Sequence, residues 1–196
     1  MNMRIDGPPG APVLVLVNSL GTTADMWQRQ MPALSSRFRV VRYEHRGHGR
    51  TETPPGPYRI DDLGGDLLGV LDRAAADRAS VMGLSLGATI ALWLAAHHPD
   101  RVDRLVLACG AAHWPPRQAW LARIDQVAAG GPGSLLDTLL GRWFTPALLE
   151  RRPEVREELA VMLDAVSPDG YAGCCHALAD TDLRPLLPSV SAPTLV

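Results

Sequence analysis

The sequence lacks several features that mark particular classes of protein. It contains no lysine, so all 19 basic residues are arginine, and the net charge is only −2. Such a balance gives no reason to expect nucleic acid or an anionic membrane surface as a partner. The absence of lysine, together with many alanines, glycines and prolines, indicates codon bias in a GC-rich genome rather than a function.

Cysteine is also scarce, with only Cys109, Cys174 and Cys175 present. An odd count with two adjacent residues does not fit a disulfide framework. We interpret the adjacent pair as packing residues rather than as a nucleophile. No C-x-x-C or H-E-x-x-H pattern predicts a metal site, and no cofactor is expected. No apolar leader opens the chain and no apolar run is long enough to cross a bilayer, so we expect a cytoplasmic protein with no membrane partner.

The patterns that are present alternate between strands and helices. With 46% hydrophobic and 20% charged residues, the 196-residue chain can bury a core as one domain. Val13–Val17 is a continuous run of aliphatic residues, typical of a strand buried on both faces. The alternation predicts an α/β fold with a mostly parallel sheet and helices on both faces. We expect strands at 13–17, 38–43, 79–82 and 102–108, and helices at 24–34, 61–76 and 88–96.

This alternation stops after residue 113 and gives way to a mainly helical region. We predict a helical cap over 114–186, inserted into an α/β core that consists of 1–113 and 187–196. The expected cap helices are 118–129, 134–143, 146–166 and 170–179. A further strand begins at Ala192, so the core is expected to be incomplete at its C-terminal side.

The most informative motif is Gly83-Leu84-Ser85-Leu86-Gly87, which lies between an expected strand and an expected helix. This context is that of a nucleophile elbow, in which a tight turn presents a serine at the end of a strand. The turn leaves no room for side chains at its two glycines. Ser85 is therefore the predicted catalytic nucleophile, at a helix N-terminus that favours developing negative charge.

An oxyanion hole is the second part that a serine hydrolase of this architecture needs. One donor is expected from the N–H of the residue after the nucleophile, Leu86. The other is expected from the loop after Val17, where Leu20 is the candidate. Both loops leave the carboxyl ends of parallel strands, where sites form in open α/β sheets.

The chain resembles the α/β-hydrolase fold and, more narrowly, the 3-oxoadipate enol-lactonases of the β-ketoadipate pathway of bacterial aromatic catabolism. The resemblance covers nearly the whole chain. The elbow motif indicates the fold alone, whereas the resemblance to lactonases rests on the N-S-L-G-T loop and the G-Y-x-x-C-C segment. The segments that carry it are 18–22, 26–27, 42–49, 54–58, 83–87 and 167–184.

The resemblance implies hydrolysis of a small-molecule lactone or ester, in the narrow case 3-oxoadipate enol-lactone. Ser85 would attack the carbonyl, Leu20 and Leu86 would hold the oxyanion, and water would hydrolyse the acyl-enzyme with a histidine as base. The substrate carries a carboxylate arm, so the cap should supply a cation. Arg142, beside Trp143, resembles the cap motif of the family and is the candidate for substrate binding.

The catalytic acid and histidine of this fold are not found in their expected order after Ser85. They should follow the strand near Thr194, whereas the sequence ends at Val196. We therefore expect a truncated lactonase, nearly inactive alone, that lacks a C-terminal segment or is a partner of a fused decarboxylase domain.

None of the six histidines is expected to replace the missing base. Two lie about 18 Å along the helix that follows Ser85, at a rise of 1.5 Å per residue. Two lie in an R-G-H-G loop that we interpret as structural, one follows the strand at 102–108 with no acid nearby, and one lies in the cap. In this order they are His97 and His98, His45 and His48, His113, and His176.

Two other functions stay open at this point. One is a different ester hydrolase of the same fold, such as an esterase or a haloperoxidase-like enzyme, because the shape of the cap decides the substrate. The other is a non-catalytic protein that keeps a ligand site under the cap, or one half of a split polypeptide.

Overall fold

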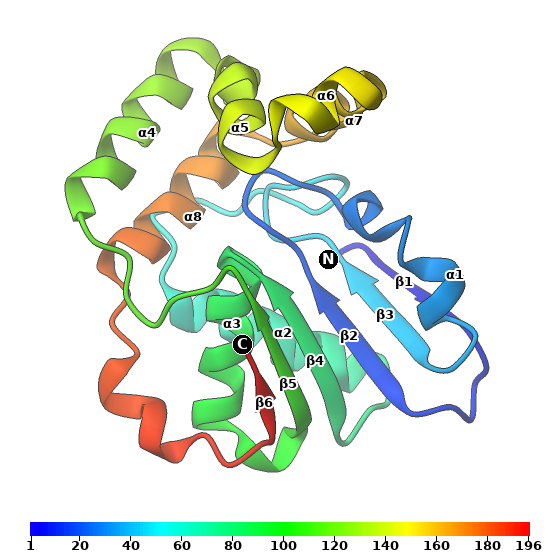
Figure 1. Cartoon of the computed structure of the whole chain (residues 1–196). Helices are drawn as coiled ribbons and strands as arrows, with labels where there is room; N and C mark the ends of the chain where they lie inside the picture. Colours follow the sequence, from blue (N-terminus) through cyan, green and yellow to red (C-terminus); the bar gives the residue numbers. More distant parts are fainter.

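A six-stranded sheet forms the centre of the computed structural model, which describes residues 1–196 (Figure 1). The strand order is β1-β3-β2-β4-β5-β6, and every neighbouring pair is parallel except β1 with β3. The predicted α/β class is confirmed. The strands are β1 (Met3–Asp6), β2 (Val13–Val17), β3 (Arg39–Tyr43), β4 (Ala79–Leu84), β5 (Val102–Ala108) and β6 (Thr194–Leu195).

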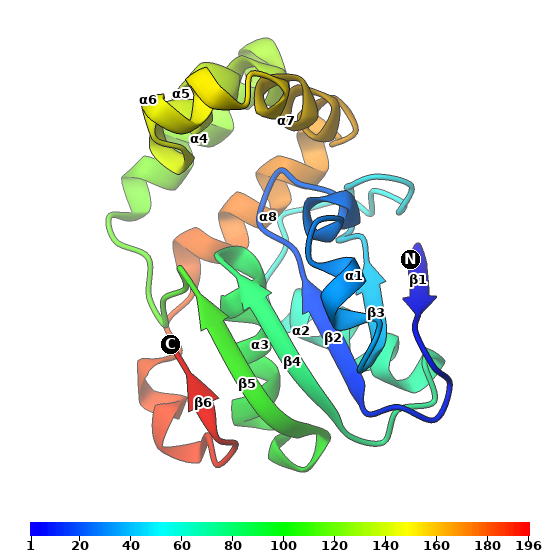
Figure 2. The same cartoon turned by 45° about the vertical axis from the view of Figure 1, so that its right-hand side comes forward.

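Helices cover both faces of this sheet, as Figure 2 shows. Helices α2 (Ile60–Arg73) and α3 (Leu86–His97) pack on one face, while the short α1 (Met31–Leu34) and the 3-10 helix η1 (Ala24–Trp27) lie on the other. The side chains of β2 divide accordingly, because successive residues point to opposite faces. Val15 and Val17 belong to the main core with α2 and α3, and Leu14 and Leu16 pack with Trp27.

The cap comprises the helices that connect β5 to β6, and it lies above the carboxyl ends of the strands (Figures 1 and 2). Its last helix returns toward the sheet and packs along the first. The cap helices are α4 (Arg117–Gly130), η3 (Pro132–Leu135), α5 (Leu136–Trp143), α6 (Pro146–Arg151), α7 (Glu154–Asp164) and α8 (Pro168–Asp180). Short 3-10 turns, η2 (Pro99–Arg101) and η4 (Arg184–Ser189), lead into β5 and β6.

Two predicted helices are each divided by a proline. The sequence predicts one helix over 24–34, whereas the structure has η1 and α1, and the predicted 146–166 helix is divided into α6 and α7. Pro32 lies in the first turn of α1, and Pro153 is the residue before α7. Proline has no N–H to donate to the preceding turn, so it starts a helix rather than continuing one.

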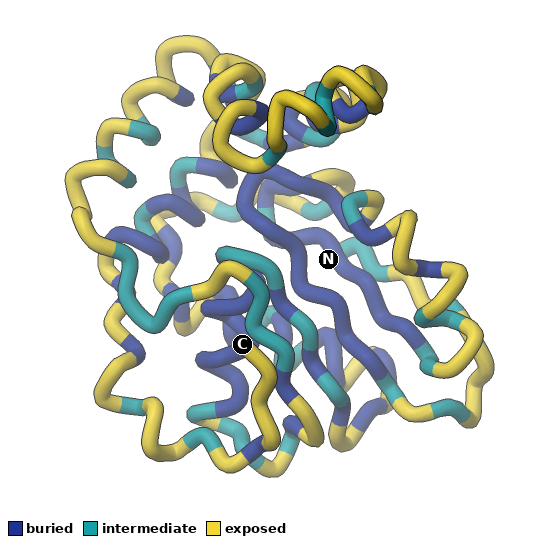
Figure 3. Tube along the Cα trace, viewed as in Figure 1, coloured by how far each residue is buried: buried dark blue, intermediate teal, exposed yellow.

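Burial follows the layers of the fold. The central strands and α3 are buried, whereas the outward surfaces of the cap are exposed (Figure 3). The edge strand β1, which the sequence does not predict, has Arg4 and Ile5 exposed. At the other edge, β6 is exposed along its whole length. None of the helices combines the length and the apolar character that a membrane span requires.

Candidate active site

Ser85 occupies a strained position between β4 and α3. Its backbone has φ +55° and ψ −114°, a conformation that residues with side chains rarely adopt. The turn is held because the N–H of Ser85 donates to the carbonyl of Ala108 at 2.9 Å, and the carbonyl of Ser85 accepts the N–H of Ala88 at 3.0 Å. Ser85 is half-buried at the carboxyl edge of the sheet, and its hydroxyl makes no hydrogen bond with another protein group.

The two glycines of the motif are required by close backbone contacts, as predicted. A Cβ on Gly83 would overlap with the backbone of Gly87, on the other side of the turn. A Cβ on Gly87 would overlap with the carbonyls of Val17 and Asn18. The first turn of α3 therefore packs directly against the end of β2, which brings the loop after β2 beside Ser85.

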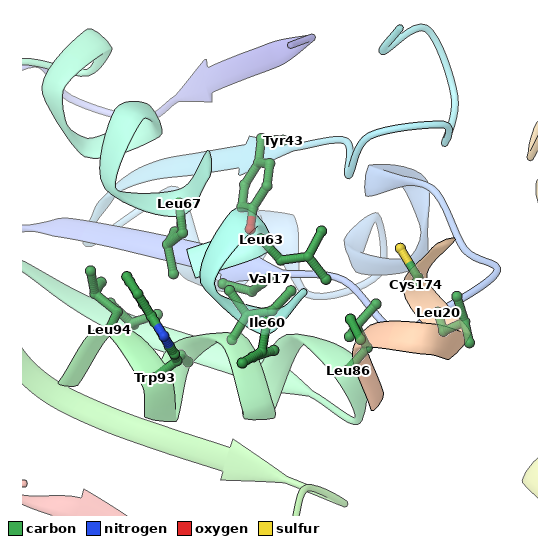
Figure 4. Close-up of a cluster of buried hydrophobic side chains, with 14 of the residues drawn as sticks. Val17, Leu20, Tyr43, Ile60, Leu63, Leu67, Leu86, Trp93, Leu94 and Cys174 are labelled. Carbon is green, nitrogen blue, oxygen red and sulfur yellow. The ribbon is translucent and has the colours of Figure 1, made fainter. Parts of the chain in front are cut away.

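Two backbone N–H groups are available where the sequence predicts an oxyanion hole. Leu86 is the first residue of α3, so its N–H has no acceptor within the helix. The N–H of Leu20 also makes no hydrogen bond within the protein. In the parallel register Val17 pairs with Gly83, so the two loops leave the sheet side by side. The buried side chains of Leu20 and Leu86 belong to the same hydrophobic cluster, part of which Figure 4 shows.

Buried polar groups fix the loop that carries Leu20. Asn18 donates from Nδ2 to the carbonyl of Tyr43 and accepts from Nε1 of Trp27, each at 2.8 Å. Nε2 of His45 lies 2.9 Å from the carbonyl of Asn18 and donates to it. Because every partner is buried, a displacement of the loop would leave polar groups unpaired, which costs about 1–3 kcal/mol for each.

His48 binds the same loop at its turn. Its Nε2 accepts the N–H of Gly21 at 3.1 Å, and its Nδ1 donates to the carbonyl of Arg46 at 3.1 Å. This pair of bonds requires a neutral ring. Burial, with a smaller contribution from His45, lowers the pKa of His48 to about 3. The R-G-H-G loop thus has the structural role that the sequence suggests. It holds Gly21, which directly follows Leu20.

The remaining histidines do not reach Ser85 through any hydrogen bond. Nδ1 of His113 lies 3.0 Å from the carbonyl of Thr181. The expectation that no acid lies near His113 is wrong, because Asp182 pairs with it in an isolated β-bridge. However, the Asp182 carboxylate binds the guanidinium of Arg184 at 2.6 Å, which lowers its pKa, so it does not orient the histidine. His97 stacks on Trp93 at the far end of α3.

The two candidates in α5 are exposed. Trp143 has 38% of its surface exposed, and Arg142 makes neither an ion pair nor a hydrogen bond with the protein. Helix α5 lies above the carboxyl edge of the sheet (Figure 1), but no contact joins either residue to Ser85. Their predicted part in substrate binding stays a prediction.

The cysteine pair of α8 is buried in the main core. Burial raises the pKa of Cys174 and that of Cys175, the latter to about 12, so both thiols stay protonated at neutral pH. A protonated thiol is a poor nucleophile. The pair therefore packs α8 against the core, in agreement with its interpretation from the sequence.

Two surface depressions lie away from Ser85. One, of about 480 Å³, is bordered by residues 53–57 and by α8, including Asp169 and His176. The other, of about 330 Å³, lies between the start of α2 and the end of α8. No group of three histidine, cysteine, aspartate or glutamate side chains is arranged to hold a metal ion.

Comparison with known proteins identifies the family to which the chain belongs. The profile of the family described as alpha/beta hydrolase fold matches residues 12–140. The chain belongs to the α/β-hydrolase fold family. Within it, 3-oxoadipate enol-lactonase 2 of Acinetobacter baylyi is 41% identical over 196 residues, which are 100% of this chain and 73% of that protein.

Other members of the α/β-hydrolase family are also similar. The crystal structure of the enol-lactonase from Burkholderia xenovorans LB400 has a TM-score of 0.96 at 42% identity, over 100% of this chain and 76% of that one. A protein of Klebsiella pneumoniae (strain 342), named as a candidate carbamate hydrolase RutD, is 30% identical over 96% of this chain and 73% of its own. These likenesses support an enzyme of the α/β-hydrolase type that cleaves lactones or esters.

We predict that His48→Gln weakens the acid sensitivity of the fold. The pKa of His48 is about 3 in the folded state and about 6.5 when unfolded, so the unfolded state binds more protons between these values. His48 therefore contributes stability above pH 6.5 that is lost as the pH falls towards 3. Urea unfolding at pH 7.5 and 5.0 should show a smaller difference for the variant, and an identical difference in both proteins would contradict this.

Proposed function

We propose that Ser85 is the nucleophile of a hydrolase that opens a lactone, with 3-oxoadipate enol-lactone as the substrate. The observation that carries the proposal is the strained elbow at Ser85, which leaves the sheet next to the loop of Leu20, and the unpaired N–H groups of Leu20 and Leu86 support it. The likeness to enol-lactonases along the whole chain supports the choice of substrate.

The proposed reaction has two halves. The Ser85 hydroxyl loses its proton to a base as Oγ attacks the lactone carbonyl, and the oxyanion accepts hydrogen bonds from Leu20 and Leu86. The ring C–O bond then breaks, and the departing enolate takes up a proton and becomes a ketone. Water attacks the acyl-enzyme, the same base accepts its proton, and Ser85 is released with the product acid.

The base is the part of the reaction that the described residues do not supply. The Ser85 hydroxyl has no histidine as a hydrogen-bond partner, and the acid beside His113 is bound to Arg184. We therefore assign the base and its acid to residues outside these 196, in a C-terminal segment or a fused domain.

A second candidate function follows from the relatives of the same family. The likeness to the RutD protein extends over 96% of this chain, and a carbamate carbonyl could be attacked by the same serine. Comparing an enol-lactone with a carbamate as substrates separates the two candidates. A preference for simple neutral esters would instead favour the general esterase that the sequence leaves open.

Replacing the nucleophile tests the proposal directly. Ser85→Ala in the full-length protein encoded by the gene should lower kcat for the enol-lactone by several orders of magnitude, because the covalent step is lost. Ser36→Ala, an exposed serine at the end of α1, should leave the rate unchanged. The rate of lactone opening is measured for both variants from the decrease in the ultraviolet absorbance of the substrate. Wild-type rates in Ser85→Ala would reject the assignment.

We further predict that the 196-residue chain alone is nearly inactive and prone to associate. Without a base Ser85 keeps its proton, and in β6 the side chain of Leu195 is 66% exposed at a sheet edge. Enol-lactone turnover and a thermal melt with light scattering on the purified chain measure the two effects. A monodisperse, cooperatively melting monomer with the rate of a complete lactonase would contradict both.

A further inference from the structure

Arg123 is a half-buried cation that has no acidic partner. It lies in α4, where its guanidinium carbon lies 5.2 Å from the ring centre of Trp120, and it forms no ion pair. Other arginines of the cap, such as Arg117 and Arg156, are bound to carboxylates at the surface. A charge that is partly removed from water is costly unless an opposite charge meets it.

Two tryptophans connect Arg123 to the nucleophile elbow. Trp120 meets Trp114 edge to face, with ring centres 5.8 Å apart, and donates from Nε1 to its carbonyl at 3.0 Å. Trp114 in turn donates from Nε1 to Oγ1 of Thr89 at 2.9 Å. Thr89 lies in the first turn of α3, and its N–H binds the carbonyl of Ser85 at 3.1 Å. Arg123 and Ser85 therefore stand at two ends of one continuous row of contacts.

A second row of contacts leads from Arg123 to the loop of Leu20. Helix α4 packs along α8, and the charge of Arg123 favours the ionised forms of Tyr171 and Cys175 on α8, against the effect of burial on each pKa. Tyr171 is fully buried, and its ring lies against Gly21, where an added Cβ would be 2.9 Å from Cε2. Tyr171 therefore connects α8, on which α4 packs, to the loop of Leu20.

We infer that Arg123 binds the terminal carboxylate of the substrate whose carbonyl Ser85 attacks, while Trp114 and Trp120 pack against the carbon chain between them. The inference rests on the proposed function and deepens it, because it names the substrate class as monoesters or lactones of short dicarboxylic acids. A guanidinium binds a carboxylate with two parallel hydrogen bonds. Arg142 is exposed to water, where a single ion pair contributes little.

A matched pair of substrates tests this role in the full-length protein. One is an aryl monoester of adipic acid with its free carboxylate, and the other is the same ester with a terminal amide. Arg123→Gln should lower the acid-to-amide ratio of kcat/KM by about ten- to a hundredfold, chiefly through KM, because a charge-assisted hydrogen bond is lost. Arg123→Lys should recover part of the ratio. Arg151→Gln, an exposed and unpaired arginine of α6, is the control and should leave it unchanged.

Three results would overturn the inference. An equal loss on both esters would make Arg123 structural, an unchanged ratio would remove it from the site, and a collapse of the ratio in Arg142→Gln alone would assign the carboxylate to Arg142. If neither ester is hydrolysed, the proposed function fails but Arg123 is still tested, by calorimetry of adipate binding to Ser85→Ala. Arg123→Gln in that background should abolish binding, and unchanged binding or none at the start would reject the site.

Discussion

The contact between the first turn of α3 and the end of β2 determines the geometry of the whole site. Gly87 has no side chain, so the start of the helix lies directly on the carbonyls of Val17 and Asn18. One contact thus fixes both the orientation of Ser85 and the position of the loop that begins at Asn18. Any side chain at Gly87 would separate Ser85 from Leu20. The strain at Ser85 persists because hydrogen bonds on both sides of the turn hold it.

Neutral polar groups hold the loop that carries Leu20 at Asn18 and at Gly21. Asn18, His45 and His48 bind it through backbone carbonyls and N–H groups, and burial lowers the pKa of both histidines. A charged group at these places would need a counter-charge close to the proposed oxyanion and would alter its stabilisation. Neutral donors and acceptors give rigidity without that interference, which suits the proposed reaction, in which negative charge develops in the transition state.

The sequence predicts the parts of the fold that depend on local pattern. The aliphatic run of β2 predicts a strand, because such a run requires burial on both faces. The glycines around Ser85 predict a tight turn, because the backbone contacts there leave no room for side chains. Pro32 and Pro153 also carried a signal, and the division of two helices could have been read from them.

Other features depend on residues that are distant in the sequence. The hydrogen bond between Gly21 and His48 joins residues that are 27 positions apart. The R-G-H-G motif indicates a structural loop, but it does not predict which residue His48 binds. Arg123 is one of 19 arginines and differs from them only in its surroundings, since its burial and its lack of an acid emerge when α4 packs on α8. The sequence instead directs attention to Arg142, whose neighbouring tryptophan is 38% exposed.

The division between core and cap explains how relatives with different named activities share one arrangement. In the proposed reaction the elbow and its two N–H groups act on the carbonyl alone, which a lactone, an ester and a carbamate all contain. Discrimination must come from groups that meet the rest of the substrate. In this chain the cap presents Trp114, Trp120 and Arg123 in a row that starts at the elbow helix. An apolar stretch that ends in a cation selects acyl chains by their length and by their terminal charge. The groups of the elbow do not contact these parts of the substrate.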